Sequence, residues 1–123
     1  MKSIAIIGAS ANHEKFGNKC VRAYKKLGWQ VFPINPKEKG IEGFTSFQSI
    51  KDLPQKPDRV SIYLPPQVSL SIIPDLVAAN IGQVILNPGA QSGELVEALK
   101  NSGIKSKLVC SIRLEGLSPD DFP

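Results

Sequence analysis

Three times along this chain, a segment with helical spacing ends at a glycine and a short apolar segment follows. The glycines are Gly28, Gly82 and Gly103, and the apolar segments after them are WQVFPI, QVILN and KLVCSI. A glycine just after a helix adopts the left-handed conformation without steric cost, so this order is typical of chains that alternate helices and strands. Short, continuous apolar segments favour a parallel sheet that is covered on both faces. The pattern predicts an α/β fold.

Five strands are predicted, at IAIIG, WQVFPI, RVSIYL, QVILN and KLVCSI. Helices are expected over residues 17–27, briefly over 47–53, from Pro74 onwards and over 92–102. The third helix is placed after a turn, because a proline inside a helix breaks it and a proline at its first position does not. Right-handed crossovers then predict a single doubly wound, mostly parallel five-stranded sheet of the Rossmann-like type. In such a sheet the ligand crevice lies at the carboxyl ends of the strands.

Apolar spacing also predicts which side of each helix packs on the sheet. The residues expected to face inward are Cys20, Ala23, Tyr24, Leu27, Leu76, Val77, Ile81, Leu95, Val96 and Leu99. The segment EGLSPDDFP, residues 115–123, has no periodicity and is expected to be an irregular tail.

Length and composition limit the classes of protein that fit. The 123 residues suit one domain, residues 1–123, and are too few for a nucleotide domain plus a conventional catalytic domain. No apolar run approaches the roughly 18–20 residues that span a bilayer, and IAIIG is too short for the apolar part of a signal peptide. Two cysteines are too few for a disulfide framework. A cytoplasmic protein with reduced thiols and no membrane partner is therefore expected.

The loop GASANHEKFG after the first strand is suited to an anion. Gly8 allows a tight turn, and the free N–H groups and the positive end of the following helix face whatever lies above them, so phosphate is the expected guest. A dinucleotide fingerprint would have glycine in place of Ser10 and an acidic residue in place of Asn35 at the end of the second strand. Both departures argue against NAD.

Lysines near these loops add positive charge. Lys15 lies in the first loop, and Lys37 and Lys39 follow Asn35, where the phosphate of an adenosine could sit. The net charge of +4 suits a ligand with several phosphates, but solvated lysines in polar loops account for it equally well. We expect no nucleic-acid partner.

Several segments, taken in their order, resemble the CoA-binding protein family, the small relatives of the N-terminal domain of the succinyl-CoA synthetase alpha subunit. They are IGAS with a late glycine, FPINPK, SIKDLP, DRVSIYLPP and IGQVILNPG, and the likeness covers roughly residues 3–115. The resemblance implies a Rossmann-like domain that binds coenzyme A or an acyl-CoA at the carboxyl edge of its sheet.

The resemblance also implies a set of binding residues from four loops. They are Gly8, Ala9, Ser10, Lys15, Phe16 and Gly17 for the phosphates; Asn35, Pro36 and Lys37 for the adenosine and its 3′-phosphate; Leu64, Pro65 and Pro66 for the adenine or the pyrophosphate; and Leu86, Asn87 and Pro88 beside the pantetheine path. Many members of the family have a cysteine where this chain has Ser111, with Cys110 one position earlier. A shift by one residue reverses the face of a strand, so no thiol role is inherited.

No catalytic or metal-binding residue is predicted. The synthetases need a phosphorylated histidine from a second domain, and the single histidine here, His13, has no carboxylate at a telling position beside it. Cys20 lies on the packing stripe of its helix, which favours a buried structural thiol. The prediction is a non-catalytic binding module. Two alternatives remain: a CoA-binding subunit of a multi-chain acyl-CoA synthetase-like enzyme, with a separate partner chain, or an NAD(P)- or nucleotide-binding regulatory domain.

Overall fold

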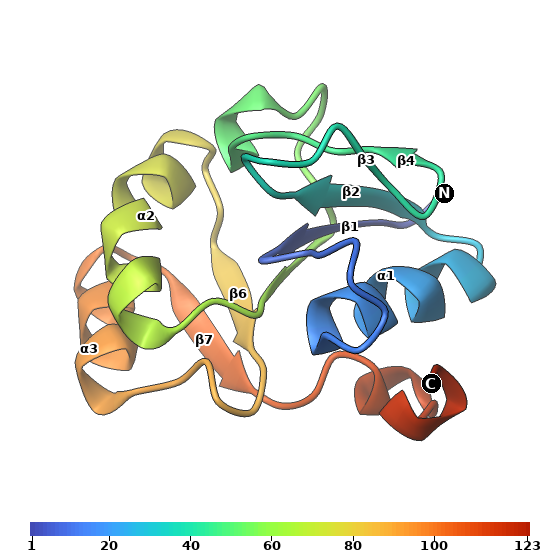
Figure 1. Cartoon of the computed structure of the whole chain (residues 1–123). Coiled ribbons are helices and arrows are strands. Elements are labelled where there is room, and N and C mark those ends of the chain that lie inside the picture. Colours follow the sequence, from blue (N-terminus) through green and yellow to red (C-terminus); the bar gives the residue numbers. More distant parts are fainter.

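A five-stranded parallel sheet forms the centre of the molecule in a computed structural model that describes residues 1–123 (Figure 1). The strand order is β2-β1-β5-β6-β7, and every pairing in this sheet is parallel. The strands are β1 (Ser3–Ile7), β2 (Gln30–Ile34), β5 (Arg59–Ile62), β6 (Gln83–Leu86) and β7 (Lys105–Leu108). The predicted α/β, doubly wound fold is confirmed.

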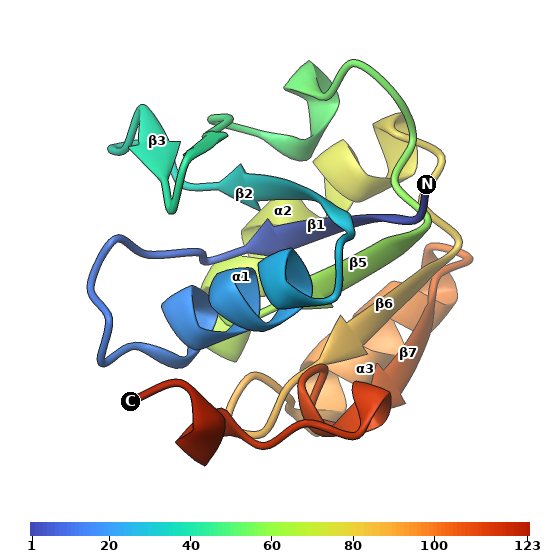
Figure 2. The same ribbon diagram turned by 90° about the vertical axis from the view of Figure 1, so that its right-hand side faces the viewer.

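The helices cover both faces of the sheet. They are α1 (Phe16–Lys26), α2 (Pro66–Ala78) and α3 (Gly93–Asn101). Helix α1 lies on one face, and α2 and α3 lie on the other (Figure 2). Successive side chains of a strand point to opposite faces, so Ile4 and Ile6 of β1 pack toward α1 whereas Ala5 and Ile7 pack toward α2 and α3.

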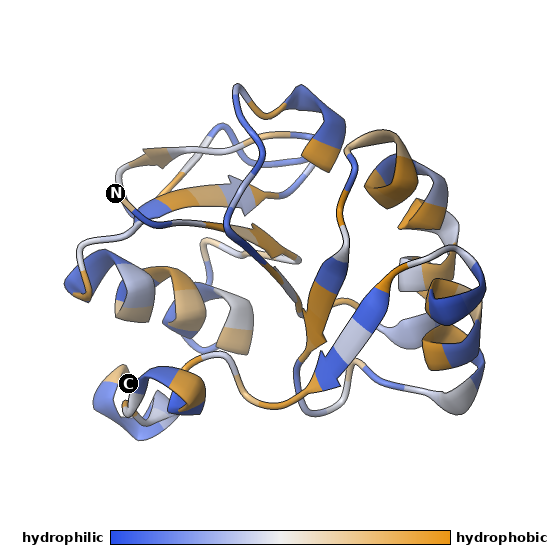
Figure 3. Cartoon of the chain, turned by 180° about the vertical axis from the view of Figure 1, so that it is seen from behind, coloured by the Kyte–Doolittle hydropathy of each residue, from blue (hydrophilic) through white to orange (hydrophobic).

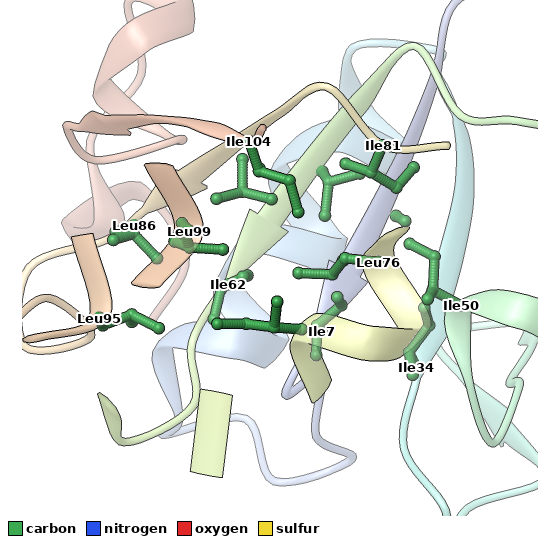
Figure 4. Close-up of a cluster of buried hydrophobic side chains, with 14 of the residues drawn as sticks. Ile7, Ile34, Ile50, Ile62, Leu76, Ile81, Leu86, Leu95, Leu99 and Ile104 are labelled. Atoms are coloured by element: carbon green, nitrogen blue, oxygen red, sulfur yellow. The ribbon is translucent and has the colours of Figure 1, made fainter. Parts of the chain in front are cut away.

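Two apolar cores follow from this arrangement. The larger joins side chains of β5 and β6 to α2 and α3 and includes Ile62, Leu76 and Leu95, each fully buried (Figure 4). The smaller joins β1, β2 and α1 to the C-terminal segment and contains Cys20 and Tyr24. No helix of the chain has the length and hydrophobicity that a bilayer crossing requires.

The sheet is wound in opposite directions from β1. The chain passes from β1 through α1 to β2, and then crosses to β5 on the other side of β1. The loops after β1 and β5 therefore separate at the carboxyl edge and leave room for a ligand there.

A small hairpin extends the chain beyond β2. It consists of β3 (Gly40–Ile41) and β4 (Phe44–Thr45), which pair antiparallel through a two-residue turn at Glu42 and Gly43. The short helix predicted over 47–53 is a 3-10 helix at Ile50–Asp52, capped by the Ser49 hydroxyl.

The predicted start of the third helix at Pro74 is wrong. Helix α2 begins at Pro66, so Pro66 is the proline at the first position and Pro74 lies inside the helix. Pro74 is exposed, and the burial of Ile73 and Leu76 beside it outweighs the one backbone hydrogen bond that its ring removes. Val77, expected to face inward, is 48% exposed.

The last strand is also shifted from its expected position. It runs over Lys105–Leu108 instead of 107–112, and it forms an exposed edge of the sheet that is hydrophilic over most of its length (Figure 3). The apolar run that suggested the later position leaves the sheet at Val109, and its Ser111 and Ile112 are buried against the sheet and α1 instead. Leu27, expected in the packing stripe of α1, follows the helix and is 37% exposed.

The segment after β7 packs beside α1 (Figure 2). It contains two short 3-10 helices, Arg113–Glu115 and Pro119–Asp121, and the second lies within residues 115–123, where an irregular tail was expected. Phe122 is 8% exposed, and the guanidinium group of Arg22 donates to the carbonyl oxygens of Phe122 and Pro123 at 3.0 and 3.1 Å.

Candidate functional site

A cleft of about 770 Å³ lies at the carboxyl edge of the sheet. All of the predicted binding residues except Leu86 and Asn87 line it. These residues come from the segments that follow β1, β2, β5 and β6. The segments are far apart in the sequence, and they meet at one edge of the sheet because the strands are parallel.

The first loop is folded tightly at its two glycines. Gly8 has φ +90°, and a Cβ at this position would meet the backbone of Tyr63 at 3.1 Å. A Cβ on Gly17 would overlap the carbonyl oxygen of Gly8. The loop therefore leaves β1 and returns to α1 in a path that only these glycines allow.

The N-terminus of α1 is open to an anion. Lys15 precedes the helix without a capping side-chain hydrogen bond, and the first turn has no acidic residue. The first amide N–H groups of a helix carry partial positive charge and have no acceptor within the helix. That the first loop receives an anion stays a prediction, and the free helix amides are what such a site would use.

Asn35 connects the first and second loops. Its Nδ2 donates to the carbonyl oxygen of Ala9 at 2.9 Å, and its Oδ1 accepts from the backbone N–H of Lys37 at 2.8 Å. Both ends of the amide are thus used to shape the cleft. No carboxylate stands at the end of β2 for the ribose diol of a dinucleotide, and exposed Lys37 lines the wall instead.

Another part of the cleft wall is apolar. Leu64, Pro65 and Pro66 lead from β5 into α2, and Val68 continues the wall along the helix. Phe16 and Val68 are 58% and 45% exposed although they are large and apolar. Exposed apolar groups at the mouth of a cleft suit the flat or aliphatic parts of a ligand.

Leu86 and Asn87 do not line the cleft. Of the three residues predicted beside the pantetheine path, only Pro88 does. The Asn87 side chain is fully buried, with Nδ2 donating to Ser61 Oγ at 2.8 Å and to the Ile62 carbonyl at 2.9 Å. Its Oδ1 accepts from the N–H of Ser111 at 2.8 Å. The asparagine therefore fixes the C-terminal segment to the sheet in this structure.

One wall of the cleft was missed by the sequence analysis. It consists of Gln48, Ser49, Ile50, Ile72 and Asp75. The Asp75 carboxylate accepts from the Ser49 hydroxyl at 3.4 Å and lies 3.4 Å from Lys51 Nζ. This contact joins the segment around the 3-10 helix to α2, and Ser49 and Asp75 are 26 residues apart in the sequence, so no local pattern predicts it.

The candidate nucleophile and base are not in the cleft wall. Burial raises the pKa of the Cys20 thiol to about 12, which keeps the thiol protonated and unreactive. The absence of a carboxylate partner for His13 was predicted wrongly, since its Nε2 lies 2.9 Å from Glu42 Oε2. No group of three or more His, Cys, Asp or Glu side chains is arranged to hold a metal ion.

The fold and the cleft define a Rossmann-like ligand-binding domain of the kind that takes a phosphate-bearing ligand at the carboxyl edge of its sheet. The chain belongs to the CoA-binding domain family, whose model matches residues 2–112.

Relatives include parts of enzymes and short proteins. ADP-forming acetate–CoA ligase I of Archaeoglobus fulgidus is 26% identical over 114 residues, which cover 85% of this chain and only 17% of the ligase. A conserved hypothetical protein of Pyrococcus furiosus has 30% identity and a TM-score of 0.82, with 94% of this chain and 99% of that chain covered. The dinucleotide-forming acetyl-coenzyme A synthetase 1 of Ca. Korarchaeum cryptofilum, in complex with phosphate and ADP, has 26% identity and a TM-score of 0.76, covering 88% of this chain and 25% of that chain.

Proposed function

We propose that this chain binds coenzyme A or an acyl-CoA in the cleft and carries out no reaction by itself. The observation that carries the proposal is the composition of the cleft, which combines cations and free helix amides with apolar residues and prolines. Membership of the CoA-binding domain family supports the same ligand.

The phosphates of coenzyme A match the first side of the cleft. In the proposal, the pyrophosphate lies over Gly8–Ser10 and the N-terminus of α1, with Lys15 beside it, and the 3′-phosphate lies near Lys37. Anions are stabilised by helix N-termini and by ammonium groups. The adenine ring lies against Leu64, Pro65 and Pro66, where its flat apolar faces exclude water.

The proposal assigns no catalytic residue. Cys20 is buried with a raised thiol pKa, and neither His13 nor Cys20 lies in the cleft wall. We also propose the cytoplasm as the site of binding, since both cysteines are unpaired and reducing compartments keep thiols in that state.

The test is a ligand series with the purified chain. Thermal unfolding is measured with coenzyme A, acetyl-CoA, NAD and ADP at equal concentrations. A ligand at 100 times its dissociation constant stabilises the folded state by about 2.7 kcal/mol, which gives a clear rise in Tm for a chain of this size. We expect coenzyme A or acetyl-CoA to raise the Tm most. A rise with NAD and none with coenzyme A would show that the chain is a dinucleotide-binding domain instead.

A second candidate function is favoured by the ligase relatives. The ADP-forming acetate–CoA ligase contains a segment like this chain within a much longer protein. In this second candidate function, a separate partner chain supplies the other domains. Co-purification of a partner chain, with nucleotide turnover that depends on an acyl group and coenzyme A, would support this function. The isolated chain is expected to show no such turnover.

A further inference from the structure

The carboxylate of Glu42 connects the β3–β4 hairpin to the first loop of the cleft. Its Oε2 accepts from Asn18 Nδ2 at 3.1 Å and lies 2.9 Å from His13 Nε2. The backbone carbonyl of the same residue accepts from Lys25 Nζ at 2.8 Å. The hairpin, the first loop and α1 are neighbours in Figure 2, but Glu42 itself does not line the cleft.

Asn18 extends this connection into the loop. It is fully buried, and its Nδ2 also donates to the carbonyl oxygen of Ser10 at 2.8 Å. Its Oδ1 accepts from Arg22 Nε at 2.7 Å, and Arg22 Nη2 donates to the carbonyl oxygen of His13 at 3.0 Å. Both Ser10 and His13 are thereby held to groups that converge on Glu42. Without that carboxylate, one N–H of a buried amide would lose its acceptor.

The backbone at Glu42 shows that this contact is retained against a local preference. Glu42 has φ 51° and Gly43 has φ 85°, both in the left-handed region, as a two-residue type I′ turn requires. Asn, Asp or Gly is favoured at the first of these positions, and a longer side chain is strained there. Glutamate is therefore less favourable than asparagine at this turn position, but its longer side chain reaches the first loop.

We propose that Glu42 is a positioning residue for coenzyme A: from outside the cleft, its carboxylate holds the Ser10–Lys15 loop in the conformation that receives the pyrophosphate. The proposal rests on the proposed function. A loop that is ordered before binding loses less conformational freedom when the ligand arrives, so the affinity is higher.

The proposal predicts an effect opposite in sign to simple electrostatics. Coenzyme A is an anion, so removal of a nearby negative charge should by itself strengthen its binding. Removal of a positioning contact should weaken it. The direction of the change therefore separates the two explanations.

Glu42→Asn is the decisive variant, because asparagine favours the turn but is one methylene too short to keep the contacts with His13 and Asn18. We expect a Tm close to that of the unaltered chain, because the better turn residue offsets the acceptor that Asn18 loses. We also expect coenzyme A binding weaker by about tenfold in calorimetry, the equivalent of one lost hydrogen bond, and faster amide hydrogen exchange at residues 10–15 of the free chain. Glu14→Gln is the matched control. It removes the same charge from the loop, and the Glu14 side chain makes no hydrogen bond or ion pair. We expect it to bind coenzyme A as well as the unaltered chain, or more tightly.

Two results would overturn the inference while leaving the proposed function intact. One is that Glu42→Asn binds coenzyme A as tightly as the unaltered chain. The other is that its loss of affinity comes with a matching fall in Tm, which would indicate a general structural role. If the unaltered chain does not bind coenzyme A at all, the proposed function fails first. Unchanged exchange at residues 10–15 would then reject the connection between hairpin and loop as well.

Discussion

Asn35 shows how a single side chain can shape a cleft through its contacts with the backbone of two loops. Its amide joins the carbonyl of Ala9 to the N–H of Lys37, and it thereby sets the distance between the first and second loops. An aspartate at this position could accept the second of these bonds but could not donate the first. Asn35, which stands where a dinucleotide fingerprint has an acidic residue, therefore holds the two loops together.

Lys37 provides a direct test of where the 3′-phosphate lies. The Lys37→Ala variant is expected to weaken coenzyme A binding by about threefold to tenfold, since an exposed charge-assisted contact is partly screened by solvent. Dephospho-CoA, which lacks that phosphate, should bind almost unchanged. Calorimetric titration with both ligands measures the difference. Lys39→Ala, in the same loop but outside the cleft wall, is the control; equal weakening of both ligands by Lys37→Ala would move this lysine away from the 3′-phosphate.

Cys20 should behave as a core residue toward reagents. Burial raises the pKa of its thiol to about 12 from 9.0, so almost none of it is thiolate at pH 8. We expect iodoacetamide to leave Cys20 unmodified in the folded chain and to modify it in denaturant, as read by mass spectrometry.

The same pKa shift makes folding sensitive to alkali. The unfolded chain releases the thiol proton more easily than the folded chain, so the free energy of unfolding should be unaffected below about pH 9 and fall as the pH rises above it.

In the labelling experiment, rapid modification of Cys20 in the folded chain at pH 8 would contradict its burial.

At the scale of elements, α2 is held in place by its neighbours more than by its own sequence. Pro74 lies in its interior and cannot donate a hydrogen bond to the carbonyl of Leu70. Ile73 and Leu76 nevertheless keep the helix on the sheet through burial in the larger core.

Pro74→Ala is therefore expected to stabilise the chain. It restores a backbone hydrogen bond at an exposed position and changes no packing, although the more flexible unfolded chain offsets part of the gain. The free energy of unfolding should rise by about 1–2 kcal/mol in urea titration. Pro66→Ala, at the first helical position, should give no such gain. A lower stability of Pro74→Ala would mean that the proline bends α2 into its packing position.

The sequence predicts the fold well because Gly28 and Gly103 mark helix ends and most of its strands are short apolar runs. The prediction for Gly82 is wrong, since α2 ends at Ala78 and the left-handed residue after it is Asn80. It predicts most of the cleft wall because Gly8, Lys37 and Pro65 follow directly after strands that must end at one edge. It does not predict the wall formed by Ser49 and Asp75, whose contact depends on tertiary packing alone. It misplaces α2 and β7 because the helix rule for Pro74 was overridden by packing, and because the apolar run after Lys107 packs outside the sheet.

At the scale of the whole molecule, the C-terminal segment completes the smaller core. Phe122 is buried against α1, Tyr24 donates to the carbonyl oxygen of Ser111 at 2.7 Å, and Arg59 forms an ion pair with Glu115 at 3.0 Å. These contacts join the C-terminal segment to α1 and to the start of β5.

Phe122→Ala should reveal how much this segment contributes. Loss of the buried ring is expected to lower the free energy of unfolding by about 3 kcal/mol. Leu108→Ala, at a residue that is 53% exposed, should change it by less than about 0.5 kcal/mol. Urea unfolding of both variants tests the prediction, and an equal, small effect would show that the C-terminal segment rests on the surface without supporting the core.

The outermost strand, β7, has partners on one side only, and it carries the ammonium groups of Lys105 and Lys107. Unpaired backbone along such a rim can template the addition of a strand from another molecule. If two copies paired through their β7 edges, four lysine ammonium groups would come close together and would have to be desolvated. The two lysines therefore disfavour edge-to-edge aggregation of this protein, even at high concentration.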